Sequence, residues 1–276
     1  MGIVRVEGAR LYYQAAGAGR PLLLLHGLGS SNRDWEYQVP EFSRHFHVLA
    51  PDFRGHGGSG RTGGYGVERF ASDAWQLLDQ LGYGEADVLG YSMGGAVAMQ
   101  MALDRPRTIR RLVLSNTLPS FRADTLAKRW LLWSRLLLMA WLGPRRLSDV
   151  MTRRLYPRPD QAALRARVAR RNAENDKSVY LETVRALTQW SVDGRLAELT
   201  MPVLVLAAEH DYFLRSEAEA FVAALPDARF ELFPGTRHGL PLEQPEAFNR
   251  AVLEFLLPRA APELPAARLP PALQHS

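Results

Sequence analysis

The chain has 276 residues, 47% of them hydrophobic, which is enough for one α/β domain with an insertion. It contains no cysteine, so disulfides, thiolate catalysis and cysteine-ligated metals are excluded. The net charge of +5 arises in residues 119–196, which hold 16 basic and 7 acidic side chains without any nucleic-acid motif, so we expect no nucleic-acid partner. The N-terminus lacks the apolar region of a secretory signal, and with the absence of cysteine this favours a cytoplasmic protein.

The first half of the chain alternates short apolar runs, typical of strands, with segments of helical periodicity. Such alternation is typical of a mostly parallel sheet that is covered by helices on both faces. The predicted strands are Gly2–Glu7, Arg10–Ala15, Pro21–His26, His47–Pro51, Ala86–Leu89 and Ile109–Leu114. The predicted helices between them are Trp35–Ser43, Val67–Leu81 and Ala96–Leu103.

A serine stands between glycines where the fifth predicted strand meets the next helix, at residues 90–95. A sharp strand-to-helix turn pushes the hydroxyl of Ser92 above the edge of the sheet. Such a turn requires glycine at Gly90 and Gly94, because side chains there would collide with the neighbouring backbone. The start of the helix also directs backbone N–H groups towards an oxyanion beside the serine. The pattern therefore predicts that Ser92 is a nucleophile.

After residue 118 the alternation of strand and helix stops, and the pattern is helical from Phe121 to about Ser191. We predict a core domain of residues 1–118 and 197–258 and a helical cap of residues 119–196. Residues 259–276 are rich in proline and alanine and have no periodicity, which predicts a flexible tail.

The first cap helix, expected from Asp124 to Leu142, has large apolar side chains at helical spacing. The run is too short and too charged to cross a bilayer, which needs about 20 apolar residues, so we expect no stable membrane insertion. Three roles remain open: packing onto the core, lining an apolar acyl pocket, and contacting a membrane at its interface. The candidate substrate-binding residues are Trp130, Trp133, Leu137 and Trp141.

Two later strands, predicted over residues 201–208 and 230–233, are followed by an acid and a histidine. Open α/β sheets place their sites at the carboxyl ends of the strands, so Ser92, Asp211 and His238 are expected to meet at one edge. His238 would take the proton of the serine hydroxyl. Asp211 would fix the tautomer of the histidine and stabilise the imidazolium.

These motifs resemble those of the α/β-hydrolase superfamily of serine hydrolases, over about residues 4–257. Residues 21–29 resemble the strand and oxyanion loop of that family, and residues 50–59 resemble its D-x-R-G-x-G-x-S turn. The resemblance implies a mostly parallel central sheet, helices on both faces and an inserted helical cap. It also implies that the backbone N–H groups of Leu28 and Met93 form an oxyanion hole, and that His26 braces the oxyanion loop.

Some members of this superfamily carry the acid after the strand that precedes the cap, where this chain has the uncharged Asn116. Asp211 is therefore the better candidate, with Glu209 as a weak alternative. The serine at the strand-to-helix turn of residues 90–95, which is called the nucleophile elbow in this family, disfavours haloalkane and epoxide substrates. Relatives that act on those substrates need a carboxylate nucleophile at this position. We expect no cofactor, since the glycine-rich loop at residues 63–66 lacks the surroundings of a phosphate-binding turn. We also expect no metal.

The leading functional prediction is a carboxylesterase that acts on small-to-medium, largely apolar esters through an acyl-enzyme at Ser92. One alternative is a carbon–carbon bond hydrolase or (enol-)lactonase of aromatic-compound degradation, in which a cap arginine could hold the carboxylate of the substrate. A minor alternative is a non-catalytic ligand-binding or scaffold protein on the same fold. The natural substrate and the oligomeric state stay open.

Overall fold

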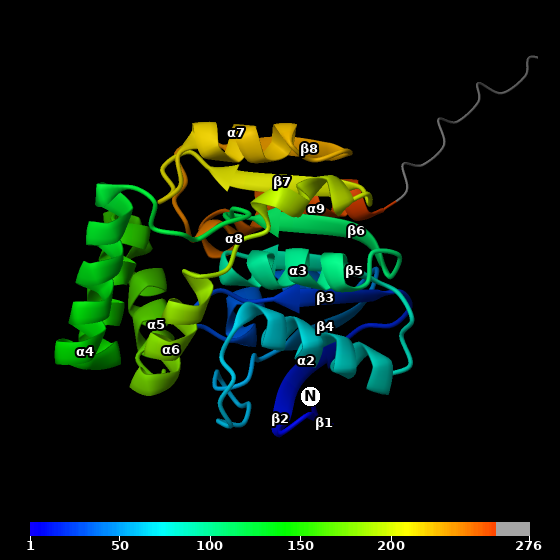
Figure 1. Cartoon of the computed structure of the whole chain (residues 1–276), viewed down its shortest axis with the longest axis horizontal. Helices are drawn as coiled ribbons and strands as arrows, with labels where there is room; N and C mark the ends of the chain where they lie inside the picture. Colours follow the sequence, from blue (N-terminus) through cyan, green and yellow to red (C-terminus); the bar gives the residue numbers. More distant parts are fainter. Residues whose placement is uncertain (258–276) are drawn as a thin grey trace, which may run out of the picture.

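The eight strands form one sheet in the order β1-β2-β4-β3-β5-β6-β7-β8, in a computed structural model that describes residues 1–257 (Figure 1). β2 pairs antiparallel with β1 and with β4, and the remaining neighbours are parallel, so the predicted mostly parallel α/β sheet is confirmed. The predicted tail, residues 259–276, lies outside the described residues. The strands are β1 (Gly2–Val6), β2 (Ala9–Ala16), β3 (Pro21–Leu25), β4 (His47–Pro51), β5 (Ala86–Tyr91), β6 (Ile109–Ser115), β7 (Val203–Ala208) and β8 (Ala228–Phe233).

Helices cover both faces of the sheet, and each face has its own hydrophobic cluster. The alternation is visible in β3, where Leu23 and Leu25 belong to one cluster and Leu22 and Leu24 to the other, as the two-residue period of a strand requires. The first cluster includes side chains of α2, α3 and α7, and the second those of α1, α8 and α9. These helices are α1 (Gln38–Phe42), α2 (Val67–Gln80), α3 (Met93–Asp104), α7 (Arg215–Ala223), α8 (Leu240–Glu243) and α9 (Pro245–Leu256).

Between β6 and β7 the chain leaves the sheet and forms a separate helical layer at the carboxyl ends of the parallel strands (Figure 1). At the base of this layer Ser120 pairs with Ser191, which brings the entering and leaving segments together. The first helix breaks at Gly143, whose φ of 73° lies in the left-handed region. None of the helices within residues 1–257 is long and apolar enough to span a membrane. The main helices of the layer are α4 (Leu126–Leu155), α5 (Ala162–Asn172) and α6 (Lys177–Leu187).

Candidate active site

Ser92 occupies a strained turn between β5 and α3, with φ 53° and ψ −117°. A Cβ atom built on Gly90 would lie 2.3 Å from the carbonyl oxygen of Gly94. One built on Gly94 would lie 2.0 Å from the carbonyl oxygen of Leu25. The predicted steric need for glycine on both sides of the serine is confirmed, and it explains how the turn can be this tight.

The structure brings Ser92, His238 and Asp211 into one hydrogen-bonded chain. The Nε2 atom of His238 lies 2.9 Å from Oγ of Ser92, and its Nδ1 atom lies 2.6 Å from Oδ1 of Asp211. In this arrangement Nδ1–H donates to the carboxylate, and Nε2 is free to accept the serine proton. The alternative acid, Glu209, instead accepts the N–H of Gly235 at 2.8 Å on the exposed side of the loop.

Asp211 is oriented by Asn116, the residue that follows β6. The Asn116 Nδ2 group donates to Oδ2 of Asp211 at 2.5 Å, and the Tyr212 N–H donates to Oδ1. Burial alone raises the pKa of the Asp211 carboxyl, but the charge and hydrogen bond of His238 and the donated bonds outweigh burial, so the net pKa is lowered. The carboxylate therefore stays ionised beside the imidazole, as the orienting role requires.

The loop after β3 lies against the nucleophile. A Cβ atom on Gly27 would be 3.6 Å from Cβ of Ser92, and Leu28 lines the same cavity as the serine. Met93 is the first residue of α3, so its N–H has no acceptor within the helix. These positions suit a pair of oxyanion donors at Leu28 and Met93, and that role stays a prediction.

Two buried side chains hold the oxyanion loop in place. Nε2 of His26 accepts the N–H of Phe53 at 3.1 Å, so its Nδ1 carries the proton and donates to the Gly27 carbonyl at 2.8 Å. Burial lowers the pKa of His26 to about 4, which keeps the ring neutral. The carboxylate of Asp34 accepts the Gly27 N–H and the Ser30 hydroxyl, and burial raises its pKa to about 6.

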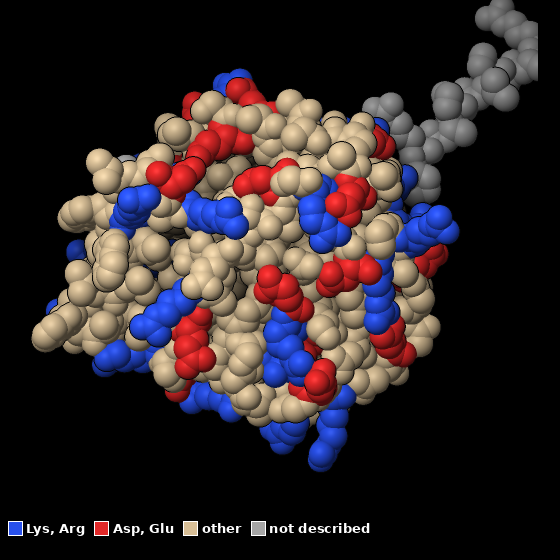
Figure 2. Space-filling view, viewed as in Figure 1, with Lys and Arg blue, Asp and Glu red and all other residues tan. Residues whose placement is uncertain are grey.

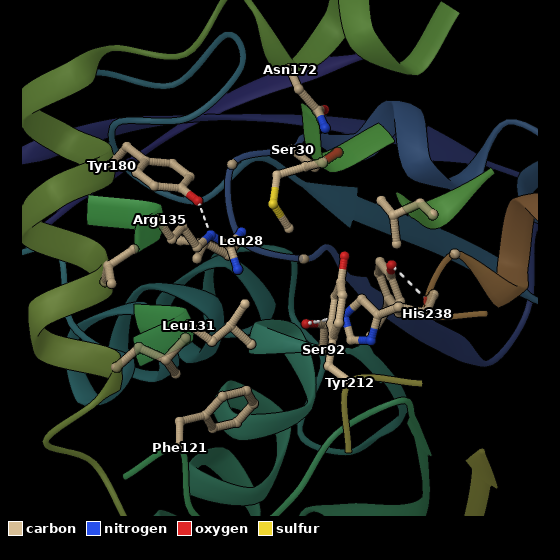
Figure 3. Close-up of a pocket in the computed structure, with 18 of the residues that line it drawn as sticks. Leu28, Ser30, Ser92, Phe121, Leu131, Arg135, Asn172, Tyr180, Tyr212 and His238 are labelled. Carbon is tan, nitrogen blue, oxygen red and sulfur yellow. Dashed lines mark hydrogen bonds between the residues drawn. The ribbon is translucent and has the colours of Figure 1, made fainter. Parts of the chain in front are cut away.

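A cavity of about 230 Å³ opens between the sheet and the cap, with Ser92 and His238 in its wall (Figure 3). Its walls are mostly apolar, which suits a ligand with hydrocarbon parts. The cap contributes apolar side chains from α4, α5 and α6, among them Leu131, Leu132, Met139, Leu147, Met151, Val168 and Val184.

The four predicted substrate-binding residues of the cap do not line this cavity. Their exposed fractions are 72% for Trp130, 64% for Trp133, 51% for Leu137 and 83% for Trp141. The structure therefore does not place these four side chains at the cavity, because α4 turns its opposite face, which bears Leu131 and Met139, towards it.

Arg135 and Tyr212 enter the cavity, and within residues 1–257 no acidic side chain pairs with Arg135. Nε of Arg135 donates to the hydroxyl of Tyr180, and its guanidinium lies 5.5 Å from the centre of that ring. The buried hydroxyl of Tyr212 has no hydrogen-bond partner among the described residues, and its ring centre lies 4.7 Å from that of His238. Figure 3 shows Arg135, a residue of α4, beside Tyr180, and Tyr212 beside Ser92 and His238. Arg135 therefore offers a partly buried cation to the cavity, and Tyr212 offers an unused hydroxyl.

Comparison with known proteins matches a family model described as alpha/beta hydrolase fold to residues 20–245. This chain belongs to that family. The hydrolase is 31% identical over 248 residues to the "Putative carbamate hydrolase RutD" of Agrobacterium fabrum, a match that covers 86% of this chain and 93% of the relative. A protein of the same name from Caulobacter vibrioides is 31% identical over 268 residues and covers 93% and 98% of the two chains.

Solved structures similar to this hydrolase include an enol-lactonase and an esterase. The enol-lactonase of Burkholderia xenovorans LB400 superimposes with a TM-score of 0.85 at 25% identity, covering 92% of this chain and 99% of that chain. A thermophilic esterase of Thermogutta terrifontis gives a TM-score of 0.80 at 26% identity and covers 90% and 93%. The predicted membership of the α/β-hydrolase superfamily is confirmed.

Three polar residues of the hydrolase's site were not predicted from the sequence. The sequence excludes Asn116 as the catalytic acid, although a polar residue at the end of the strand beside the Ser92 turn is a usable signal of a site residue. Tyr212 follows the acid directly, and its position next to Asp211 gave no indication of an unused hydroxyl. Arg135 interrupts an apolar helix, which is the pattern of a charge that faces a cavity or solvent.

Proposed function

We propose that this hydrolase cleaves carboxylic esters through an acyl-enzyme on Ser92. The observation that carries the proposal is the unbroken hydrogen-bonded path from the Asp211 carboxylate through His238 to the serine hydroxyl. Each group has the partner that its task requires: a base beside the nucleophile, and an ionised acid beside the base. The path ends at a largely apolar cavity that can hold an acyl group.

In the proposed reaction, Oγ of Ser92 attacks the ester carbonyl while Nε2 of His238 takes the hydroxyl proton. The N–H groups of Leu28 and Met93 stabilise the tetrahedral oxyanion. The intermediate then expels the alcohol, which receives the proton from His238, and the acyl group remains on the serine. Water enters, gives a proton to the same histidine and attacks the acyl carbon. Collapse of the second intermediate releases the acid and restores the serine hydroxyl.

Replacement of the nucleophile tests this function. Ser92→Ala is expected to lower the turnover of short aryl esters by about 10⁴-fold or more, because triad residues act as a unit. Ser148→Ala is a matched control, since Ser148 also lines the cavity but belongs to α4. The control should keep its rate within a few-fold. More than a few per cent of wild-type turnover in Ser92→Ala would refute the proposal.

A second candidate is a lactone or carbon–carbon bond hydrolase whose substrate carries a carboxylate. Arg135 favours it, because its guanidinium faces the cavity, has no acidic partner in the described part of the chain, and is suited to a carboxylate ligand. The unused hydroxyl of Tyr212 could donate to the same group. The similarity to an enol-lactonase agrees with this candidate, and the relatives named as carbamate hydrolases add carbamates to the substrates worth testing.

An isosteric pair of esters tests whether Arg135 binds a carboxylate of the substrate, as the second candidate requires. Monomethyl glutarate and methyl glutaramate differ only in a terminal carboxylate against a neutral amide. If Arg135 binds the carboxylate, Arg135→Met should lower kcat/KM for the glutarate by roughly 10- to 100-fold and spare the glutaramate. Arg145→Met, an exposed position of the same helix, is the control. Equal effects on both substrates would leave the neutral-ester function and remove the anionic one.

A further inference from the structure

The outer face of α4 is the most apolar exposed surface of the described chain. We define this face by Leu126, Trp130, Trp133, Leu137 and Trp141. Among the described residues ten large apolar side chains are exposed, and six of them, these five and Leu142, lie on this one helix. A contiguous exposed apolar cluster is typical of an interaction surface, whereas single exposed apolar side chains are ordinary.

The spacing of these five side chains puts them on one side of the helix. At 3.6 residues per turn, positions 126, 130, 133, 137 and 141 fall within an arc of about 80°. Leu131, Arg135 and Met139 lie on the opposite side and line the cavity. In Figure 1 α4 is the outermost element of the cap, and α5 and α6 pack against it. The helix therefore has one face in the active-site cavity and one face in solvent.

Two of the three roles left open by the sequence do not fit these side chains. They do not pack onto the core, because each is more than half exposed, and they do not line the cavity. Contact with a membrane interface is the role that remains. Tryptophan and leucine on one face of a surface helix are typical of helices that lie at the boundary of headgroups and acyl chains.

Charge around the outer face favours an anionic surface. α4 carries seven basic and one acidic side chains. Arg129 lies beside the apolar stripe at its start, and Arg145 and Arg146 follow its end; all three are exposed. The space-filling view shows an edge of mostly uncharged residues at the left, where α4 lies, with basic side chains around it (Figure 2). Apolar side chains between cations suit a layer of acidic headgroups above hydrocarbon.

A second copy of the chain fits this face less well. Isologous pairing of two antiparallel α4 helices would place Arg145 and Arg146 of one copy opposite Arg129 of the other. Both ends of the pair would then hold like charges at short range, which opposes association. In an anionic bilayer, by contrast, negatively charged headgroups would lie against the same arginines.

We propose that the outer face of α4 docks on the surface of an anionic lipid bilayer. The three tryptophans enter the headgroup boundary, and Arg129, Arg145 and Arg146 contact the acidic headgroups. The helix lies along the surface and does not cross it. The wall of the active-site cavity is thereby held directly above the lipid.

The test uses the full chain and vesicles of phosphatidylcholine, with or without roughly 30 mol% phosphatidylglycerol. Tryptophan fluorescence reports on the outer face, because the other three tryptophans, Trp35, Trp75 and Trp190, are buried. Anionic vesicles should shift the emission to the blue and co-sediment the protein, and brominated acyl chains should quench it. Neutral vesicles should bind at least about tenfold more weakly, and salt should weaken the binding to anionic vesicles.

Two sets of variants separate the apolar from the charged contribution. Trp130→Ala with Trp133→Ala should weaken vesicle binding at least about tenfold, and Ile3→Ala, at an exposed apolar position on β1, should not. Arg145→Gln with Arg146→Gln should weaken it roughly 10- to 30-fold, at about fivefold for each cation, while the exposed pair Arg107→Gln and Arg110→Gln should not. Thermal unfolding and hydrolysis of a dissolved ester are expected to stay unchanged in all of them.

Three results would overturn the proposal. One is a wild-type chain that does not bind anionic vesicles. Another is a set of tryptophan variants that bind as tightly as the wild type. The third is light scattering that shows a dimer which the tryptophan variants dissociate, without any vesicle binding, because the face would then be an interface between two copies.

Discussion

His238 and Ser92 are 146 residues apart in the chain, yet Nε2 of the histidine lies 2.9 Å from Oγ of the serine. The order of the strands explains the meeting. β5, β6, β7 and β8 are consecutive neighbours in the sheet, and they are followed by Ser92, Asn116, Asp211 and His238 respectively. Each strand delivers one polar group to the same edge. Hydrogen bonds join Asn116 to Asp211, Asp211 to His238, and His238 back to Ser92.

Exchange of the acid and its neighbouring amide tests this arrangement. Asp211→Asn should lower kcat by about 10⁴-fold, because the imidazole loses the acceptor that fixes its tautomer. Adding Asn116→Asp should restore part of that loss, since the two side chains are in contact and the carboxylate would only change strands. Steady-state kinetics of the single and double variants measure the effect. A double variant no faster than Asp211→Asn would show that Asn116 only positions the acid.

The elbow should not tolerate a methyl group. Gly94→Ala would force a Cβ atom to 2.0 Å from the carbonyl oxygen of Leu25, so we expect a loss of stability of about 3 kcal/mol or more. Gly84→Ala is the control, because nothing lies within 4 Å of its added Cβ and Gly84 is exposed, and it should change stability by less than about 0.5 kcal/mol. Urea unfolding compares the two. Equal stability would mean that the turn is wider than described.

Two buried histidines make stability depend on pH. Burial lowers the pKa of His26 to about 4 and that of His56 to about 3, from 6.5 in an exposed histidine. Between about pH 6.5 and 4 the unfolded chain therefore binds protons that the folded chain does not, and each histidine lowers the free energy of unfolding by roughly 1.4 kcal/mol per unit of acidification. Asp34 acts in the opposite sense, because its raised pKa of about 6 makes the folded state bind the extra proton as the pH falls.

The pKa values of the two histidines together shift further than that of Asp34, so these three groups make acid destabilising. Burial also raises the pKa values of Asp73, Asp87 and Glu231, which reduces this effect. We expect the free energy of unfolding to fall by at least about 1 kcal/mol between pH 6.5 and pH 5. Urea unfolding at both pH values measures the difference, and nitrogen chemical shifts should show His26 and His56 neutral at pH 5. If the free energy of unfolding were the same at both pH values and both histidines were protonated at pH 5, the burial of His26 and His56 would be contradicted.

The two faces of α4 should affect substrate choice differently. Met139 is 1% exposed and lines the cavity, so Met139→Ala should lengthen the preferred acyl chain by roughly one or two carbons, each worth about 0.8 kcal/mol of burial. Trp133→Ala, on the outer face, should leave the preference unchanged. A series of p-nitrophenyl esters from acetate to octanoate gives the comparison. If only Trp133→Ala changed the preferred chain length, the acyl chain would bind at the outer face of α4 and not in the cavity.

Much of the core was predictable because its rules are local. The strand-like run before Ser92, the glycines around it and the helix after it follow from steric limits that act within a few residues. The sheet then brings Asp211 and His238 to the serine, since carboxyl ends of parallel strands share one edge. The bounds of β4 were predicted exactly as His47–Pro51, and those of β5 to within two residues.

The inner face of the cap could not be predicted in the same way. α4 is apolar on both sides, so Leu131 and Met139 are no more hydrophobic in the sequence than Trp130 and Trp133. Which side faces the cavity is decided by tertiary packing against α5 and α6, which the periodicity of α4 alone does not reveal. The role of Arg135 depends on the same orientation.

The most direct test of the central claim is to trap the nucleophile. A fluorophosphonate should react with the wild-type protein at one residue, and peptide mass spectrometry should locate the adduct on Ser92, with loss of ester hydrolysis in proportion to labelling. Ser92→Ala should take up no label under the same conditions. An adduct on another residue, or full hydrolysis by protein labelled at Ser92, would contradict the account.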